Sequence, residues 1–264
     1  MELGLRSRTV ILTGASMGIG RATALAFARE GCNLVLCARR PEPLKDVAEE
    51  ARAIGARVEA RALDVTDLDT PAQLVDAARD LGGVDVLVNN AGGGTPPIRI
   101  HDLTMADWQA HFELNFFSAV RLATACLPAM RAQGWGRIVN ISSTVGRQPD
   151  PWFGGYSAAK AALINFSKNL SLAYSREGVL TNCIIPGLAY TETVKTKTVS
   201  AAHRQDTSED EVIAKMLEKT PIAVGRPGQP DEIAGAILFL ASEQASWISG
   251  ACLQVDGGTI RAAP

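Results

Sequence analysis

The chain has 264 residues, of which 47% are apolar and 20% charged, so it can bury a sizeable core. Its 26 basic and 28 acidic residues give a net charge of −2, which indicates neither a nucleic-acid-binding surface nor a solvating acidic tail. We see neither a signal peptide nor an apolar run long enough to span a bilayer, and we expect a cytoplasmic protein with no membrane partner.

Short apolar runs alternate along the chain with longer helical patterns. The predicted strands are 9–13, 33–38, 57–63, 84–90, 136–142, 179–186 and 252–258. The predicted helices are 19–31, 42–54, 69–82, 105–132, 155–176, 209–219 and 230–242. Near-continuous apolar strands joined by helices predict a parallel seven-stranded sheet with helices on both faces. We therefore expect a doubly wound α/β fold of the Rossmann type, with 1–264 as one domain.

One stretch interrupts this alternation. Residues 187–229 contain a polar segment, 196–211, and one predicted helix, 209–219. They follow the carboxyl end of a strand, where a substrate lid is expected.

A glycine-rich turn, TGASMGIG (13–20), joins the first strand to the first helix. Glycines permit a tight turn and let backbone N–H groups approach a pyrophosphate. We predict that this turn binds a dinucleotide, and the alternative is an ordinary glycine-rich connection. The predicted contacts are Gly14, Ser16, Met17, Gly18, Ile19 and Gly20.

The end of the second strand bears on which dinucleotide binds. An acidic residue commonly holds the ribose 2′-hydroxyl of NAD there, but Ala38 is followed by Arg39 and Arg40. Because a guanidinium can bind a 2′-phosphate, NADP(H) is favoured, with NAD(H) as the alternative. A solvated arginine pair is the structural alternative.

Polar or small residues also follow other strands at the same edge of the sheet. Asp64 follows the third strand, and we expect it to accept a hydrogen bond from an adenine amino group. Two asparagines and a glycine at the end of the fourth strand would be costly as core, so they are expected beside a ligand. The further predicted cofactor contacts are Val65, Asn90, Ala91, Gly92, Pro186 and Gly187.

Tyr156 and Lys160, in YSAAK, lie one turn apart on the predicted helix 155–176, so they share one face. Ser143 follows the fifth strand, and we expect it to meet the phenol across a cleft. The alternatives are a surface helix with an unrelated tyrosine and lysine, and a serine that only satisfies the backbone.

Taken in order, these motifs resemble those of the short-chain dehydrogenase/reductase (SDR) family over essentially the whole chain. The motifs are T-G-x-x-x-G-I-G, D-V, N-N-A-G, a mid-helix asparagine, a serine, Y-x-x-x-K and P-G. The resemblance implies Tyr156 as the general acid/base and Ser143 as the hydrogen-bonding partner of the substrate oxygen. It implies that Lys160 favours the phenolate and holds the nicotinamide ribose.

The same resemblance implies two further roles and shows one departure. Asn115 would sit in a bent helix and anchor a water beside Lys160; the alternative is a satisfied buried amide. Thr191 would contact the nicotinamide carboxamide. Met17 stands where many NADP-using relatives carry a basic residue, so the NADP prediction depends on Arg39 alone.

The implied reaction is hydride transfer between a nicotinamide and a small carbonyl or secondary-alcohol substrate. The substrate pocket is expected between residues 94–98, 144–153 and 187–205, where Arg147 is either a guide for anionic substrates or a solvated loop residue. Alternatives are reduction of a 3-oxoacyl thioester and, in another class, a non-catalytic dinucleotide sensor or scaffold. Relatives imply a homo-oligomer, a tetramer or dimer.

No metal site is expected. The five cysteines are scattered, and the three histidines lack ligand spacing with one another or with the cysteines.

Overall fold

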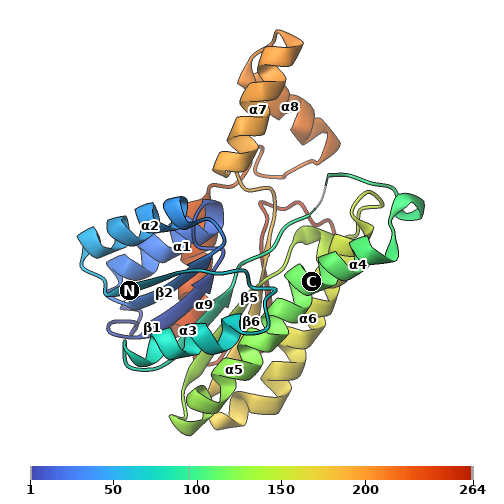
Figure 1. The fold of residues 1–264 in the computed structure, drawn as a ribbon. Coiled ribbons are helices and arrows are strands. Elements are labelled where there is room, and N and C mark those ends of the chain that lie inside the picture. Colours follow the sequence, from blue (N-terminus) through green and yellow to red (C-terminus); the bar gives the residue numbers. More distant parts are fainter. Residues whose placement is uncertain (1, 95, 263–264) are drawn as a thin grey trace.

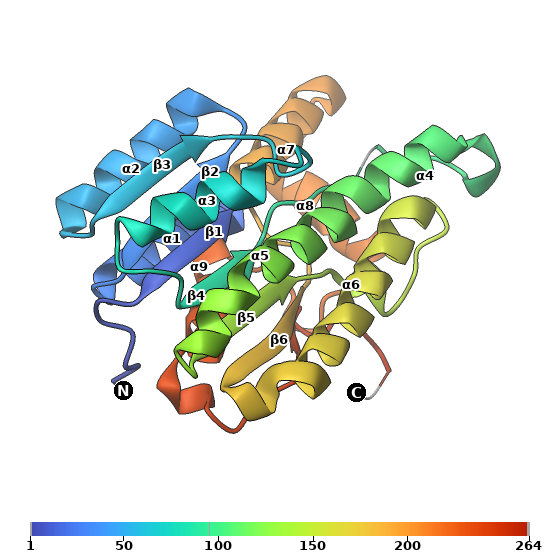
Figure 2. The same cartoon turned by 60° about the horizontal axis from the view of Figure 1, so that its bottom comes forward.

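The computed structural model describes residues 2–94 and 96–262. Seven parallel strands form one sheet in the order β3-β2-β1-β4-β5-β6-β7, which confirms the predicted doubly wound fold (Figure 2). The strand order reverses beside β1, because β1 pairs with both β2 and β4. The strands are β1 (Thr9–Thr13), β2 (Asn33–Ala38), β3 (Val58–Ala62), β4 (Val86–Asn89), β5 (Gly136–Ile141), β6 (Val179–Pro186) and β7 (Cys252–Val255).

Helices cover both faces of this sheet. Successive strand residues pack into different cores: Val10 and Leu12 of β1 face one, and Ile11 faces the other. Such two-sided burial explains why the strands read as continuous apolar runs. The first core includes α1 (Gly18–Arg29), α2 (Pro41–Ile54) and α9 (Pro230–Ala241), and the second includes α3 (Thr70–Arg79), α5 (Ser118–Ala132) and α6 (Gly154–Tyr174).

The long helix predicted over 105–132 is interrupted. It consists of α4 (Met105–Phe112), a π-helical turn (Glu113–Phe117) and α5. A π turn inserts one extra residue into a helical turn and is often found at functional sites. Asn115 lies on this turn with 1% of its surface exposed, so the interruption places a buried amide at the carboxyl edge of β4.

The segment 187–229 contains two helices where the sequence predicted one. The expected α8 is present (Glu209–Lys219), but α7 (Glu192–Gln205) also forms across most of the polar segment 196–211, where no helix was predicted before residue 209. Thr191 caps α7 by accepting a hydrogen bond from the Val194 N–H. The hydroxyls of Thr196 and Thr198 bond to carbonyls four residues earlier, which spares these threonines from competing with the helix backbone.

In Figure 1, α7 and α8 lie against each other and project from the body of the molecule beyond the carboxyl ends of the strands. After β7, Asp256 accepts hydrogen bonds from the backbone of Gly258 and Ile260 and ends the strand earlier than predicted. Within the described residues, no helix combines the length and apolarity needed to cross a bilayer.

Candidate functional site

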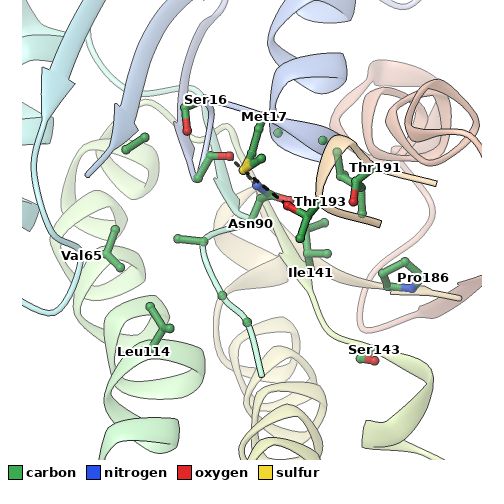
Figure 3. Close-up of a pocket in the computed structure, with 18 of the residues that line it drawn as sticks. Ser16, Met17, Val65, Asn90, Leu114, Ile141, Ser143, Pro186, Thr191 and Thr193 are labelled. Carbon is green, nitrogen blue, oxygen red and sulfur yellow. Dashed lines mark hydrogen bonds between the residues drawn. The ribbon is translucent and has the colours of Figure 1, made fainter. Parts of the chain in front are cut away.

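A cavity of about 670 Å³ opens where several strands end (Figure 3). Most residues predicted from the sequence line it. These are Gly14, Ser16, Met17, Gly18, Ile19, Gly20, Arg39, Arg40, Val65, Asn90, Ala91, Gly92, Ser143, Tyr156, Lys160, Pro186, Gly187 and Thr191. Two predicted residues, Asp64 and Asn115, lie outside the lining.

The glycine-rich turn has the backbone geometry that its sequence predicts. Gly14 and Gly18 have φ angles of +65° and +54°, which residues other than glycine rarely adopt. A methyl group on Gly20 would clash with the carbonyl oxygen of Gly14. The turn therefore brings bare backbone and the N-terminus of α1 to the cavity, and Met17, the N-cap residue of α1, makes no side-chain cap.

Asn90 fixes this turn from the neighbouring strand. Its amide Nδ2 donates to the carbonyls of Thr13 (2.9 Å) and Gly14 (3.1 Å). In return, the Thr13 hydroxyl accepts hydrogen bonds from the N–H groups of Asn90 and Ala91. The N-N-A-G motif thus links β4 to the glycine-rich turn, which explains polar residues at a buried strand end.

Ser143, Tyr156 and Lys160 come together on one side of the cavity. Ser143 follows β5, and its hydroxyl hydrogen-bonds the Tyr156 phenol, which is half-buried on α6. The ammonium of Lys160 lies 5.8 Å from the centroid of the Tyr156 ring. It donates to the carbonyl of Ile141 at 2.7 Å, and the residue is only 3% exposed. All three side chains face one space.

Burial shifts both titratable groups of this trio toward their neutral forms. It raises the pKa of Tyr156 above its usual 10, against a smaller lowering by the Ser143 hydrogen bond. It lowers the pKa of Lys160 from 10.5 to about 8. We expected Lys160 to favour the phenolate, but desolvation of the phenol is the largest effect on its pKa.

Asn115 holds the loop after β4. Its Oδ1 accepts a hydrogen bond from the Gly93 N–H (2.9 Å), and its Nδ2 donates to the carbonyls of Gly93 and His111 (3.1 and 3.0 Å). The amide is therefore satisfied by backbone, as in the alternative reading of this residue. A methyl group on Gly92 would lie 2.8 Å from Asn115 Oδ1 and 3.0 Å from Lys160 Nζ, so this glycine lets the two side chains approach.

The two arginines after β2 differ in their surroundings. Arg39 is 70% exposed and lies 4.0 Å from the carboxylate of Asp64. Arg40 donates to the sulfur of Met17 at 2.9 Å. Asp64 accepts hydrogen bonds from the backbone and hydroxyl of Thr66, which stabilises the turn, and it lies outside the cavity lining; its contact with an adenine amino group stays a prediction.

Several lining residues escaped the sequence analysis. They are Leu63, Gly93, Leu114, Ile141, Ser142 and Thr193. Ala38 also lines the cavity; it was discussed only because it is not the acidic residue common in NAD-binding sites. Gly93 and Leu114 each adjoin a motif residue, a signal that could have found them. Thr193 enters through the unpredicted helix α7, where its hydroxyl lies 4.0 Å from the Met17 sulfur.

Parts of two expected substrate walls, 94–98 and 144–153, contact the trio or each other; residue 95 is outside the described residues. A methyl group on Gly94 would meet the Tyr156 ring at 3.6 Å. The Ile98 N–H donates to the carbonyl of Trp152 (3.0 Å), and the Arg99 guanidinium stacks on the Trp152 ring. A second cavity of about 350 Å³ lies between residues 144–151, the end of α8 and the C-terminal segment.

Known proteins are similar to this chain over nearly its whole length. Residues 8–202 match the family model described as short chain dehydrogenase. The chain is 35% identical to the 7alpha-hydroxysteroid dehydrogenase of Escherichia coli strain K12, covering 98% of this chain and 97% of that protein.

Two solved structures are also similar. The L-sorbose reductase of Gluconobacter frateurii, complexed with NADPH and L-sorbose, gives a TM-score of 0.94 at 34% identity, covering 100% of both chains. A 7alpha-hydroxysteroid dehydrogenase complexed with NADH and 7-oxo glycochenodeoxycholic acid gives 0.87 at 34% identity, covering 100% of this chain and 98% of that one.

Proposed function

The chain belongs to the short-chain dehydrogenase family and is an oxidoreductase acting on alcohol or carbonyl groups, and from this premise we propose that it transfers a hydride between NADP(H) and a small carbonyl or secondary-alcohol substrate. One observation carries the proposal: Ser143, Tyr156 and Lys160 line the same cavity as the glycine-rich turn. The hydroxyls of Ser143 and Tyr156 and the buried amine of Lys160 can move a proton, and the adjacent glycine-rich turn can bind the dinucleotide that exchanges the hydride.

The residues present fit a nicotinamide dinucleotide. The glycine-rich turn lines the cavity with backbone, and Gly14 keeps the turn tight because a methyl group there would lie 2.8 Å from Asn90 Nδ2. The N-terminus of α1 faces this cavity, and its positive end favours a pyrophosphate. When bound, the nicotinamide supplies the hydride acceptor or donor.

Tyr156 then moves the proton. Because burial raises its pKa, the phenol is protonated at neutral pH and can donate to the oxygen of a carbonyl substrate. Ser143, already bonded to the phenol, would hold that oxygen and stabilise charge developing on it. Lys160, cationic below about pH 8, would stabilise the phenolate that remains. A neutral phenol favours the reduction of a carbonyl at neutral pH.

Arg39 and Arg40 support NADP(H) over NAD(H). Both line the cavity at the end of β2, where an acidic residue would repel a 2′-phosphate. The exposed Arg39 pairs only loosely with Asp64, so its guanidinium can turn to a phosphate at little cost. We propose that Arg39 binds the 2′-phosphate and that Arg40 packs beside it.

For Asn115 we keep the role of a water anchor as a proposal. Its amide is bonded to backbone, but the π turn that carries it lies directly behind Gly92 and Lys160. A water held by backbone carbonyls there would link Lys160 to solvent. Thr191, which caps α7 and lines the cavity, is proposed to contact the carboxamide.

We further propose one domain over 1–264 with 187–229 as its substrate lid, because Gly187, Thr191 and Thr193 of this segment line the cavity and α7 and α8 project from the body beyond the strand ends (Figure 1). Exposed apolar side chains at Leu172, Trp247 and Leu253 support a homo-oligomer. Five unpaired cysteines suit a reducing compartment such as the cytoplasm.

The test compares wild type with Tyr156→Phe across a panel of ketoses, cyclic ketones and 3-oxoacyl thioesters. We expect the variant to bind NADPH as wild type does and to lose about 10²–10⁴-fold in carbonyl reduction, the usual contribution of a general acid. Preference for the thioesters would favour the 3-oxoacyl reductase alternative. If both proteins bind NADPH and neither turns over any carbonyl or alcohol, the sensor alternative replaces this proposal.

A further inference from the structure

Two cysteines lie side by side at the β7 edge of the sheet. Cys183 of β6 and Cys252 of β7 are register partners, and the Cys183 N–H donates to the carbonyl of Ala251 at 2.8 Å. Neighbouring strands lie about 4.8 Å apart. This spacing falls within the Cα separation of roughly 4.4–6.8 Å that a disulfide bridges. Both cysteines are free thiols in the structure.

The two thiols have unequal surroundings. Cys183 is fully buried, whereas Cys252 is half-buried. The Cys183 thiol donates to the carbonyl of Ile184 at 3.6 Å, and the interaction between the two neighbouring sulfurs lowers the pKa of Cys252 and raises that of Cys183. Burial opposes the lowering at Cys252, while the cations of Arg147 and Lys168 add to it.

The other thiols lack this setting. Burial raises the pKa of Cys32, Cys37 and Cys126 to about 12, so these side chains stay protonated and inert. A partly exposed thiolate in a positive environment, next to a second thiol, is the arrangement found in redox-sensitive proteins.

We propose that Cys252 and Cys183 form a hydroperoxide-sensitive pair that closes reversibly into a disulfide between β6 and β7. The Cys252 thiolate attacks an oxygen of hydrogen peroxide; an S–O bond forms, the O–O bond breaks and hydroxide leaves, so sulfur is oxidised and peroxide reduced. Cys183 then attacks this sulfenic acid; the S–S bond forms, and the Cys183 proton leaves with the hydroxyl as water. A dithiol reductant cleaves this disulfide and restores both thiols.

The pair is placed to affect the candidate site. The Cys183 side chain interacts electrostatically with Lys160, and β6 runs on to Pro186 and Gly187, which line the cavity. A tether between β6 and β7 would restrain this end of β6 and remove the thiol facing Lys160. We therefore expect the disulfide to reduce turnover, an effect that rests on the proposed function.

The test exposes the full-length reduced protein to hydrogen peroxide and counts thiols after denaturation. We expect two of the five thiols to be lost, to return with dithiothreitol, and to map to one peptide pair containing Cys183 and Cys252. Cys183→Ala should leave Cys252 as a sulfenic acid that dimedone labels. Cys252→Ala should lose no thiol to a disulfide. Cys32→Ala is the matched control, because it removes a buried thiol that donates to the Leu5 carbonyl. Its peroxide-induced disulfide should form as in wild type.

Retention of all five thiols by wild type, or a disulfide joining another pair, overturns the proposal. A disulfide that forms without a reversible loss of carbonyl reduction overturns its role as a switch. Thiol counts and peptide maps need no turnover, so they remain decisive even if the reduced protein proves to be a non-catalytic binder.

Discussion

The carboxylate of Glu192 accepts a hydrogen bond from the backbone N–H of Gly18 at 2.9 Å, which joins the first turn of α7 to the first turn of α1. Glu192 itself lies outside the cavity lining, whereas its neighbours Thr191 and Thr193 are part of it. The contact therefore holds these two threonines toward the cavity while leaving its interior open.

Glu192→Ala should weaken NADPH binding. A hydrogen bond to a charged group contributes about 1.5–3 kcal/mol, and partial exposure reduces this, so we expect a Kd about threefold to tenfold higher by fluorescence titration. Glu192→Gln retains an acceptor and should lose less. Tighter binding in the alanine variant would mean instead that the carboxylate repels the phosphates.

Gly92→Ala should impair turnover far more than Gly93→Ala. A methyl group on Gly92 would press on Asn115 Oδ1 and Lys160 Nζ, whereas one on Gly93 would meet nothing within 4 Å. We expect the first variant to lose about 1–3 kcal/mol of unfolding free energy, as overpacked sites do, and most of its activity. Equal behaviour of the two variants, in urea unfolding and steady-state kinetics, would contradict the packing around Lys160.

Lys160 should make stability rise with pH over a defined window. Its pKa is about 8 in the folded protein and 10.5 in the unfolded chain, so between these values the unfolded state binds more protons. Stability attributable to this group is therefore lowest below pH 8 and increases toward pH 10.5, by up to about 3 kcal/mol at 1.36 kcal/mol per pKa unit.

The measurement is the difference in unfolding free energy between wild type and Lys160→Met at several pH values. Subtracting the variant removes contributions from other titrating groups. We expect the difference to shift in favour of wild type as pH rises from 8 to 10. A flat difference would mean that Lys160 is not desolvated.

Arg39→Ala should reduce selectivity for NADPH. Loss of a charge-assisted contact to the 2′-phosphate predicts about tenfold to hundredfold weaker NADPH binding with NADH binding unchanged. Arg61→Ala, a control on the neighbouring strand β3 whose guanidinium pairs with Glu59, should leave both cofactors unaffected. An equal loss of both dinucleotides would place Arg39 outside the 2′-phosphate site.

Much of the fold could be predicted because local patterns and tertiary packing agree. The strands are buried on both faces, so each appears as an apolar run between polar segments, and the βαβ rhythm then sets a parallel sheet. Helix α7 was not predicted because its sequence has no helical periodicity of apolar residues. Thr196 and Thr198 have low helix propensity, and only the structure shows that their hydroxyls bond to carbonyls within the helix.

The candidate site was predictable where residues are close in sequence. Tyr156 and Lys160 are one helical turn apart, and the glycines define their own turn. Contacts that join distant segments could not be predicted, because they depend on strand register and side-chain direction. The pairing of Cys183 with Cys252 and the contact between Gly18 and Glu192 both belong to this second class.

The π turn at Glu113–Phe117 has a consequence for chain length. It holds one residue more than an α-helical turn of the same rise, so deletion of a single residue there would let α4 and α5 fuse into a regular helix. Because the π turn absorbs that residue, α4 and α5 would keep their facing toward the sheet, and only the bulge that carries Asn115 would be removed. The Asn115 amide would swing off Gly93, and the loop behind Lys160 would lose its brace without any change in its own sequence.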